Sequence, residues 1–381
     1  MTERIFYSDV TCQRFEAQVL SCQPRKKGYE VVLNRTAFYP EGGGQPGDRG
    51  TLGGVSVTDT QERGEEIVHI TDQPLEPGAT VTGQLDWPHR FSLMQNHSGE
   101  HIVSGIIHRR TGGNNVGFHM GSDTITVDLD VELTAGELAE IEAEANQVVW
   151  ANGAIQVFHP TAEELKALDY RSKKELTGDV RIVTFPGADT CACCGTHVTR
   201  TGEIGLIKLI SVQKFKEGSR IEMLCGDRAL TYVNGILEQN HQISVALSAK
   251  PMKTAASVER LKAEKVQLEY QLNSLEQTAF QQKAEALAGA GDVVLFEGPM
   301  APDSVRKLAV AVMETCGGRC AVFAGDEESG YKYAIGEKDG DLRAAIKEFN
   351  QKCSGRGGGK PFFAQGSVQA RRSEIEAFWK Q

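Results

Sequence analysis

Two pairs of metal-binding side chains, far apart in the sequence, constrain the fold most. His97 and His101 stand four residues apart, a spacing that places both imidazoles on one face of a helix. Cys193 and His197 are also four apart, but Gly195 between them favours a turn over a regular helix. Three imidazole nitrogens and one sulfur suit zinc, in a structural or a catalytic site. The alternative is ordinary surface histidines and a buried free cysteine.

Length and composition predict a soluble protein of several domains. A chain of 381 residues exceeds the size at which single cores stop growing, so two or three domains are expected. No apolar run approaches the roughly 18 residues of a membrane span. The first residues lack signal-peptide character, and the nine cysteines are an odd number. These features predict reduced thiols and a cytoplasmic location.

Charge is distributed unevenly along the chain. The net charge of −10 argues against a broad basic face for nucleic acid. Between residues 351 and 373, however, there is no acidic residue, while five cations occur. This segment fits either a local polyanion-binding face or a solvated charged tail.

The first predicted domain, residues 1–88, is rich in short alternating runs and is interpreted as a small β-barrel. Its most informative stretch contains Gly42, Gly43 and Gly44, which let main-chain amides approach a ligand closely. The stretch lacks the Lys-Ser/Thr ending of a phosphate-binding loop, so nucleoside triphosphate binding is not expected. A mobile turn between strands is the alternative.

Three further domains are predicted. Residues 89–232 indicate an α+β domain that contains both metal-candidate pairs, with Thr134 and Glu137 forming a helix capping box. Residues 233–289 indicate a helical or coiled-coil spacer, which is either a dimer seam or an amphipathic helix packed on its own chain. Residues 290–381 indicate a small α/β domain. Its glycine-rich end, with Arg356, Lys360 and two phenylalanines, could accommodate a nucleic-acid backbone and stack bases.

Four motifs in one order make the chain resemble the alanyl-tRNA editing proteins, the AlaX family, in its long form. It is similar to the editing and C-terminal parts of alanyl-tRNA synthetase, without the aminoacylation domain. The motifs are Phe38-Tyr39-Pro40-Glu41-Gly42-Gly43-Gly44-Gln45, His97 with His101, Cys193-Cys194-Gly195-Thr196-His197-Val198, and Gly357-Gly358-Gly359-Lys360-Pro361 with Ala364-Gln365-Gly366.

The resemblance implies a trans-editing hydrolase that deacylates Ser-tRNA(Ala), and also Gly-tRNA(Ala), at a zinc site. Mischarged alanine-specific tRNA would be its partner, and a homodimer would form through the spacer and a C-terminal DHH-associated domain. The implied residues are Thr36, Gln45 and His119 as catalytic residues, Gly42, Gly43 and Gly44 for substrate, His97, His101, Cys193 and His197 for zinc, and Arg356 and Lys360 for nucleic acid.

The chain also departs from the family pattern. Cys194 stands where many relatives have glycine, and Cys191 adds a third thiol, so either could compete with Cys193 for the metal. His119 stands where the synthetase carries glutamine, and a structural role is the alternative for it.

Two other functions fit parts of the pattern. His97 to His101 literally match the HxxEH peptidase signature, which would make Glu100 the general base. A non-catalytic RNA-binding module with structural zinc is the third possibility.

Overall fold

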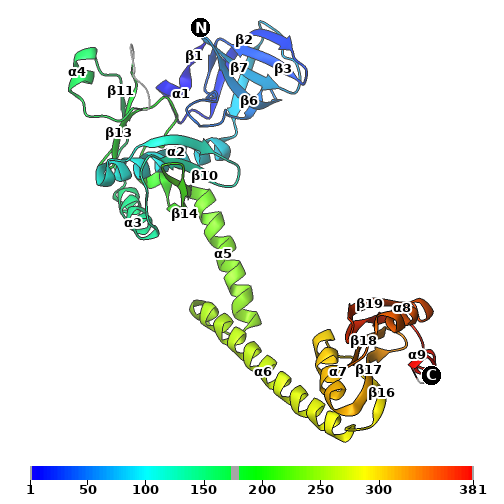
Figure 1. The fold of residues 1–381 in the computed structure, drawn as a ribbon. Coiled ribbons are helices and arrows are strands. Elements are labelled where there is room, and N and C mark those ends of the chain that lie inside the picture. Colours follow the sequence, from blue (N-terminus) through cyan, green and yellow to red (C-terminus); the bar gives the residue numbers. More distant parts are fainter. Residues whose placement is uncertain (1, 173–179, 380–381) are drawn as a thin grey trace. The chain divides into compact units, whose positions relative to one another are not determined.

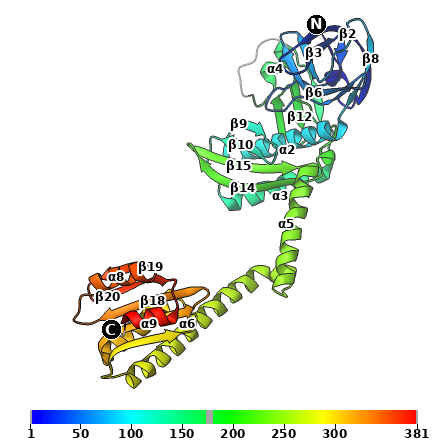
Figure 2. The ribbon, with the colours of Figure 1, turned by 90° about the vertical axis from the view of Figure 1, so that its right-hand side faces the viewer.

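The computed structural model describes residues 2–172 and 180–379; residue 1 and residues 380–381, the ends of the first and last predicted domains, lie outside this part. The chain separates into two compact units, Met1–His241 and Gln242–Gln381. Each unit contains both helices and strands (Figures 1 and 2). The prediction of a multidomain α+β protein is therefore confirmed.

Six strands of the first unit form a closed antiparallel barrel in the order β2-β3-β7-β6-β5-β8. Along β2, Phe15, Ala17 and Val19 are buried and the residues between them are exposed, because side chains alternate across a strand. The strands are β2 (Arg14–Pro24), β3 (Tyr29–Leu33), β5 (Gly50–Leu52), β6 (Val55–Arg63), β7 (Glu66–Thr71) and β8 (Thr80–Leu85).

A buried ion pair fixes the glycine-containing loop, which follows β4 (Arg35–Thr36). The strand β4 pairs in parallel with β1 (Glu3–Arg4), and the short helix α1 (Ile5–Ser8) comes next in the chain. The Arg90 and Asp48 side chains are each 1% exposed. Arg90 Nε lies 2.7 Å from Asp48 Oδ2, and Arg90 Nη2 donates to the Ala37 carbonyl at 2.6 Å. The loop is thereby joined to the helix that carries Arg90.

That helix, α2 (Trp87–Thr111), is the centre of the first unit (Figure 1). Asp86 caps its start by accepting from His89 N, and Gly112 ends it in the left-handed conformation at φ 74°. Every residue from 93 to 107 is buried, so the helix is surrounded on all sides by its own chain. A Cβ at Gly99 would lie 2.2 Å from Cys225 Sγ, which shows how closely the neighbouring strand approaches.

A four-stranded antiparallel sheet, ordered β14-β15-β10-β9, packs with α2 and α3 (Ala135–Ala151). The predicted capping box at Thr134 and Glu137 is present at the start of α3. The strands are β9 (Asn115–Met120), β10 (Ile125–Leu129), β14 (Ile207–Phe215) and β15 (Gly218–Cys225). A smaller sheet and two short helices complete this region: β11 (Gln156–Phe158), β12 (Ile182–Phe185), β13 (Asp189–Ala192), α4 (Ala162–Ala167) and η1 (Thr201–Ile204).

Helices and one mixed sheet form the rest of the chain. The helix α5 (Gly226–Ala246) crosses the boundary between the units; η2 (Pro251–Lys253) and α6 (Thr254–Ala286) follow it. Only Phe280 and Ala284 of α6 are buried, and α6 contacts α7. The sheet order is β16-β17-β18-β20-β19. Its elements are β16 (Gly291–Glu297), α7 (Pro302–Cys316), β17 (Gly317–Asp326), β18 (Gly330–Glu337), α8 (Arg343–Lys352), β19 (Gly355–Lys360), β20 (Phe363–Val368) and α9 (Arg372–Trp379).

Within residues 2–172 and 180–379, no helix is both long enough and apolar enough to cross a bilayer.

Candidate metal centre

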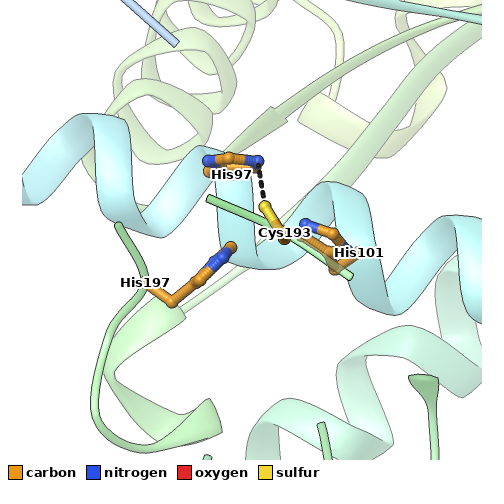
Figure 3. Close-up of side chains that lie close together, drawn as sticks. All are labelled: His97, His101, Cys193 and His197. Atoms are coloured by element: carbon orange, nitrogen blue, oxygen red, sulfur yellow. Dashed lines mark hydrogen bonds between the residues drawn. The ribbon is translucent and has the colours of Figure 1, made fainter. Parts of the chain in front are cut away.

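Four side chains from α2 and from the loop after β13 meet at one point. His97 and His101 lie one turn apart on α2, and their rings stack with centroids 5.1 Å apart. The loop places His197 with its ring centroid 4.6 Å from that of His97. One ligand atom from each of these residues and Cys193 lies within 4.8 Å of the others, and the side chains point toward one another (Figure 3). The structure thus brings together all four residues predicted as metal ligands.

Hydrogen bonds set which nitrogen of each α2 imidazole carries the proton. His97 Nδ1 lies 2.9 Å from Gln45 Oε1, and His101 Nδ1 lies 3.2 Å from Asp189 Oδ2. The Gln45 amide is oriented by Thr196, because Gln45 Nε2 donates to Thr196 Oγ1 at 2.8 Å and Oε1 accepts from Thr196 N at 3.2 Å. Both oxygens beside the imidazoles accept hydrogen bonds, so each Nδ1 carries a proton and Nε2 is the nitrogen left to face a metal ion.

The Nε2 atoms face one another without ordinary partners. Those of His101 and His197 are buried and make no hydrogen bond within the part of the chain that the structure describes. His97 Nε2 reaches Cys193 Sγ at 3.6 Å. Leaving a buried nitrogen unpaired costs about 1–3 kcal/mol. A cation that accepts these lone pairs would remove that cost, and three nitrogens with one sulfur fit a borderline-soft divalent ion.

The thiol and the imidazoles of the group are electrostatically coupled. Burial lowers the pKa of His101, but Cys191, Cys193 and Asp189 outweigh it and raise that pKa well above its usual value. Burial raises the pKa of the Cys193 thiol, but the three neighbouring imidazoles outweigh it and hold that pKa well below its usual value. Burial lowers the pKa of His197 to about 3. A thiolate and a neutral imidazole are the protonation states that bind metal ions.

The other two nearby thiols occupy different places. Cys191 Sγ lies 3.0 Å from His101 Nδ1, the nitrogen opposite the four-residue group, and forms a second cluster with His101 and Asp189. In that cluster Asp189 is already paired with Arg171, through contacts of 2.7 and 2.8 Å. Cys194 is exposed and belongs to neither cluster. The geometry therefore favours Cys193 over both alternatives as the sulfur ligand.

The glycine motif forms a tight turn beside the group. The backbones of Gly42 and Gln45 exchange two hydrogen bonds of 3.0 Å, and Gly43 and Gly44 between them have φ values of 62° and 87°. Positive φ at both central positions makes glycine the favoured residue there. A Cβ at Gly44 would lie 2.6 Å from the Phe118 ring, which stacks on His97 at 5.6 Å. The turn is therefore built against the same ring system as the histidines.

Residue 195 must be glycine because there is no room for a side chain beside His97, and not because of the turn conformation expected from the sequence. A Cβ there would lie 2.0 Å from His97 Cε1. We expect Gly195→Ala to displace His97, so that the four-residue group loses its capacity to hold a metal ion while the rest of the fold survives. Metal content per chain and circular dichroism would check this. Gly235→Ala is the matched control, because a Cβ at Gly235 on α5 meets nothing within 4 Å.

Thr36 lies within the barrel domain with its hydroxyl largely committed. It is fully buried, and its Oγ1 lies 2.8 Å from His69 Nε2 and accepts from Phe38 N at 3.1 Å. His69 Nδ1 lies 3.1 Å from the Val31 carbonyl, and burial lowers the pKa of His69 to about 4. His69 is therefore neutral with its proton on Nδ1, and Thr36 donates to Nε2. One lone pair of the Thr36 oxygen remains.

The remaining predicted site residues lie elsewhere. His119 is exposed and follows Phe118 on β9, so strand alternation directs it away from the face that contacts His97. The structure does not bring it to the four-residue group. Arg356 and Lys360 lie on β19 of the second unit and are exposed.

Sequence reasoning missed the residues that orient the imidazoles. Asp189 holds His101, and Ser98 Oγ lies 3.5 Å from His197 Nδ1. A signal for Asp189 existed, because it stands two residues before Cys191 in a strand and so shares its face. Ser98 gave no such signal, since its contact depends on a loop far along the chain.

Comparisons with known proteins place this chain in a family. The model for the threonyl and alanyl tRNA synthetase second additional domain matches residues 180–222, which include Cys193 and His197. The model for class II (A) tRNA synthetases matches residues 4–89, and the DHHA1 domain matches residues 292–381. The alanyl-tRNA editing protein AlaX-L of Pyrococcus horikoshii is 30% identical over 98% of this chain and 96% of its own length. The chain belongs to the alanyl-tRNA editing protein family.

Two further relatives align over a smaller part of this chain or of their own length. The alanyl-tRNA editing protein Aarsd1 of Mus musculus is 31% identical over 63% of this chain and 62% of its own length. The alanine–tRNA ligase of Halorubrum lacusprofundi is 31% identical over 96% of this chain but 42% of the ligase. The resemblance found in the sequence motifs is thereby confirmed.

In this editing protein the HxxEH order does not form a peptidase site. Glu100 is buried, and its carboxylate accepts from Ser104 Oγ at 2.5 Å and from Asn115 Nδ2. It is not among the residues whose ligand atoms converge with those of His97 and His101. A peptidase base must face the metal-bound water, so the peptidase interpretation lacks its essential residue.

Proposed function

We propose that the chain hydrolyses mischarged Ser-tRNA(Ala) in trans at the centre formed by His97, His101, Cys193 and His197, with Gly-tRNA(Ala) as a second substrate. Membership of the editing family makes the protein an aminoacyl-tRNA deacylase with tRNA as its partner. One observation carries the proposal: three imidazoles converge with a low-pKa thiol beside a glycine turn, and two of their buried Nε2 atoms have no partner among the described residues.

The metal in this proposal is zinc, because the donor set is three nitrogens and one sulfur. Gln45, Asp189 and Ser98 would hold the three imidazoles with Nε2 directed at it. Bound there, zinc supplies a Lewis acid that either lowers the pKa of a water molecule or holds the substrate's amine or terminal ribose.

Selectivity for serine must come from a polar contact, since alanine fits wherever serine fits. We assign this contact to Thr36, whose oxygen has one lone pair left for a substrate hydroxyl. Thr36→Val should lower the ratio of seryl to alanyl deacylation about 10- to 100-fold, the range expected for one buried hydrogen bond. Rates on the two esters measure it. Thr36→Ser keeps the hydroxyl and should keep the ratio; an unchanged ratio in Thr36→Val would contradict the assignment.

The test of the proposed function compares esters on one tRNA. Ser-, Gly- and Ala-tRNA(Ala) are incubated with the purified chain, and the remaining aminoacyl-tRNA is followed with time. We expect loss of the seryl ester, with the alanyl ester preserved. Binding of all three without hydrolysis would replace the proposal by a tRNA-binding module with a structural metal.

Binding of tRNA by the second unit is part of the proposal. A groove of about 450 Å³ is lined by Lys347, Lys360 and the glycines 357–359, and Arg356 is exposed on the same strand as Lys360. Cations beside glycine backbone suit a phosphate chain. Charge reversal at Arg356 and Lys360 should weaken tRNA binding and reduce its salt dependence by about one unit of slope per lost phosphate contact.

Filter binding across a salt series measures both effects. Lys262→Glu combined with Lys265→Glu, the same charge change on exposed α6, is the control. Equal affinity and slope in the variant with Arg356 and Lys360 reversed would remove β19 from the tRNA interface.

A homodimer through α6 and the last domain also belongs to the proposal. One face of α6 exposes apolar side chains that a second copy would cover. These are Leu261, Leu268, Leu272 and Leu275, each more than half exposed.

A further inference from the structure

Exposure indicates the side from which a large substrate reaches the centre. His97, His101 and His197 are buried at 7% exposure or less, whereas Cys193 is partly exposed. The neighbouring Cys194 is exposed. The Cys193–Cys194 segment is therefore the part of the group that reaches the surface.

Arg181, which precedes β12, lies against that segment and is held there by several contacts. Its Nη1 donates to the Cys193 carbonyl at 2.7 Å and to the Gly195 carbonyl at 3.0 Å. Its guanidinium lies 5.2 Å from the centre of the Tyr7 ring, and the Tyr7 hydroxyl donates to the Cys194 carbonyl at 3.0 Å. Arg181 and Tyr7 together bind the backbone carbonyls of residues 193–195, the segment that contains the proposed sulfur ligand.

Contacts with the described residues occupy only part of the hydrogen-bonding capacity of Arg181. A guanidinium has five N–H groups, of which the two on Nη1 serve the loop carbonyls. Nε and Nη2 have no partner in the described ranges, and no carboxylate of those ranges forms an ion pair with Arg181. The side chain is partly exposed. Among the described residues, a cation whose remaining planar donors have no partner therefore lies beside the exposed Cys193–Cys194 segment.

We propose that Arg181 binds the phosphate of the terminal nucleotide of the acceptor end and so places the ester against the centre. The proposal rests on the proposed deacylase function. The ester is carried by the terminal ribose, and the 5′-phosphate of the same nucleotide is the nearest anion, a few covalent bonds away. Guanidinium pairs with phosphate through two parallel hydrogen bonds, which fix orientation as well as distance.

The test measures binding without turnover. The probes are adenosine carrying serine through a non-hydrolysable 3′-amide, with and without a 5′-phosphate, titrated by calorimetry into the metal-loaded full chain. We expect the wild type to bind the phosphorylated probe about 10- to 100-fold tighter, the range for hydrogen bonds to a charged group. Arg181→Gln should bind both probes with the affinity of the phosphate-free one. Arg25→Gln, the same change on an exposed hairpin, should behave as wild type.

A role limited to supporting the loop gives a different result. In that case Arg181→Gln weakens the binding of both probes alike, or loses its metal. Arg181→Lys, which retains a donor for the loop carbonyls, then keeps the full preference for the phosphorylated probe. This outcome overturns the proposal. A metal-loaded Arg181→Lys or Arg181→Gln that loses the preference supports it. Failure of the wild type to deacylate Ser-tRNA(Ala) would overturn the proposed function instead, because probe binding requires no hydrolysis.

Discussion

His97→Ala is expected to reduce deacylation of Ser-tRNA(Ala) by roughly three orders of magnitude, because loss of a ligand removes several kcal/mol of transition-state stabilisation. His97 is central to the group: its ring stacks on His101 and Phe118, and its Nε2 lies 3.6 Å from Cys193 Sγ. Single-turnover hydrolysis with excess protein measures the chemical step, and metal content per chain is determined on the same sample.

The control for this variant is His241→Ala on α5, which removes an exposed imidazole of the same size. It should retain wild-type turnover and metal. Binding of tRNA by His97→Ala should also be unchanged, since the phosphate contacts proposed for β19 lie in the other unit. Wild-type turnover in a His97→Ala protein that still holds its metal would refute the zinc assignment.

Asp48→Ala is expected to lower the free energy of unfolding of the first unit by about 3–5 kcal/mol, because it leaves the Arg90 guanidinium buried without its counter-charge. Both side chains are 1% exposed, and Asp48 also accepts from Tyr39 N at 2.6 Å. Urea denaturation followed by tryptophan fluorescence, with Trp87 at the start of α2 as a reporter, measures the change.

An exposed ion pair provides the comparison. Glu132 pairs with Lys214 where both side chains are more than 60% exposed, so Glu132→Ala should leave the unfolding midpoint nearly unchanged. Replacing Asp48 by leucine together with Arg90 by methionine should recover much of the loss, because no unpaired charge remains. Equal small effects of Asp48→Ala and Glu132→Ala would show that the buried pair does not anchor the glycine loop.

The sequence predicted the parts of the site that depend on local spacing. His97 and His101 share a face because helical residues four apart do so, and Thr134 with Glu137 forms a capping box for the same local reason. The chemistry of the donor set and the motif order then indicated that Cys193 and His197 join them. Element types in the last domain were also readable, as shown by strands β16 and β17 flanking helix α7.

Contacts between remote segments could not be read in this way. The resemblance implies that Gln45 is a catalytic residue. In the structure its amide orients His97 and bonds Thr196, which stand 52 and 151 positions further along the chain. Gly195 was assigned to a turn, whereas the decisive factor is the His97 ring beside it. The order of residue types along the sequence carries no information on these contacts with His97, because they depend on how the loop after β13 packs on α2.

X-ray absorption at the zinc edge of the purified full-length chain examines the metal centre itself. We predict one zinc per chain, with three nitrogen scatterers at about 2.0–2.1 Å and one sulfur at about 2.3 Å. His97→Ala should lose a nitrogen or the metal. A protein that deacylates Ser-tRNA(Ala) without bound metal, or whose zinc shows two or more sulfur ligands, would contradict the proposed centre of His97, His101, Cys193 and His197.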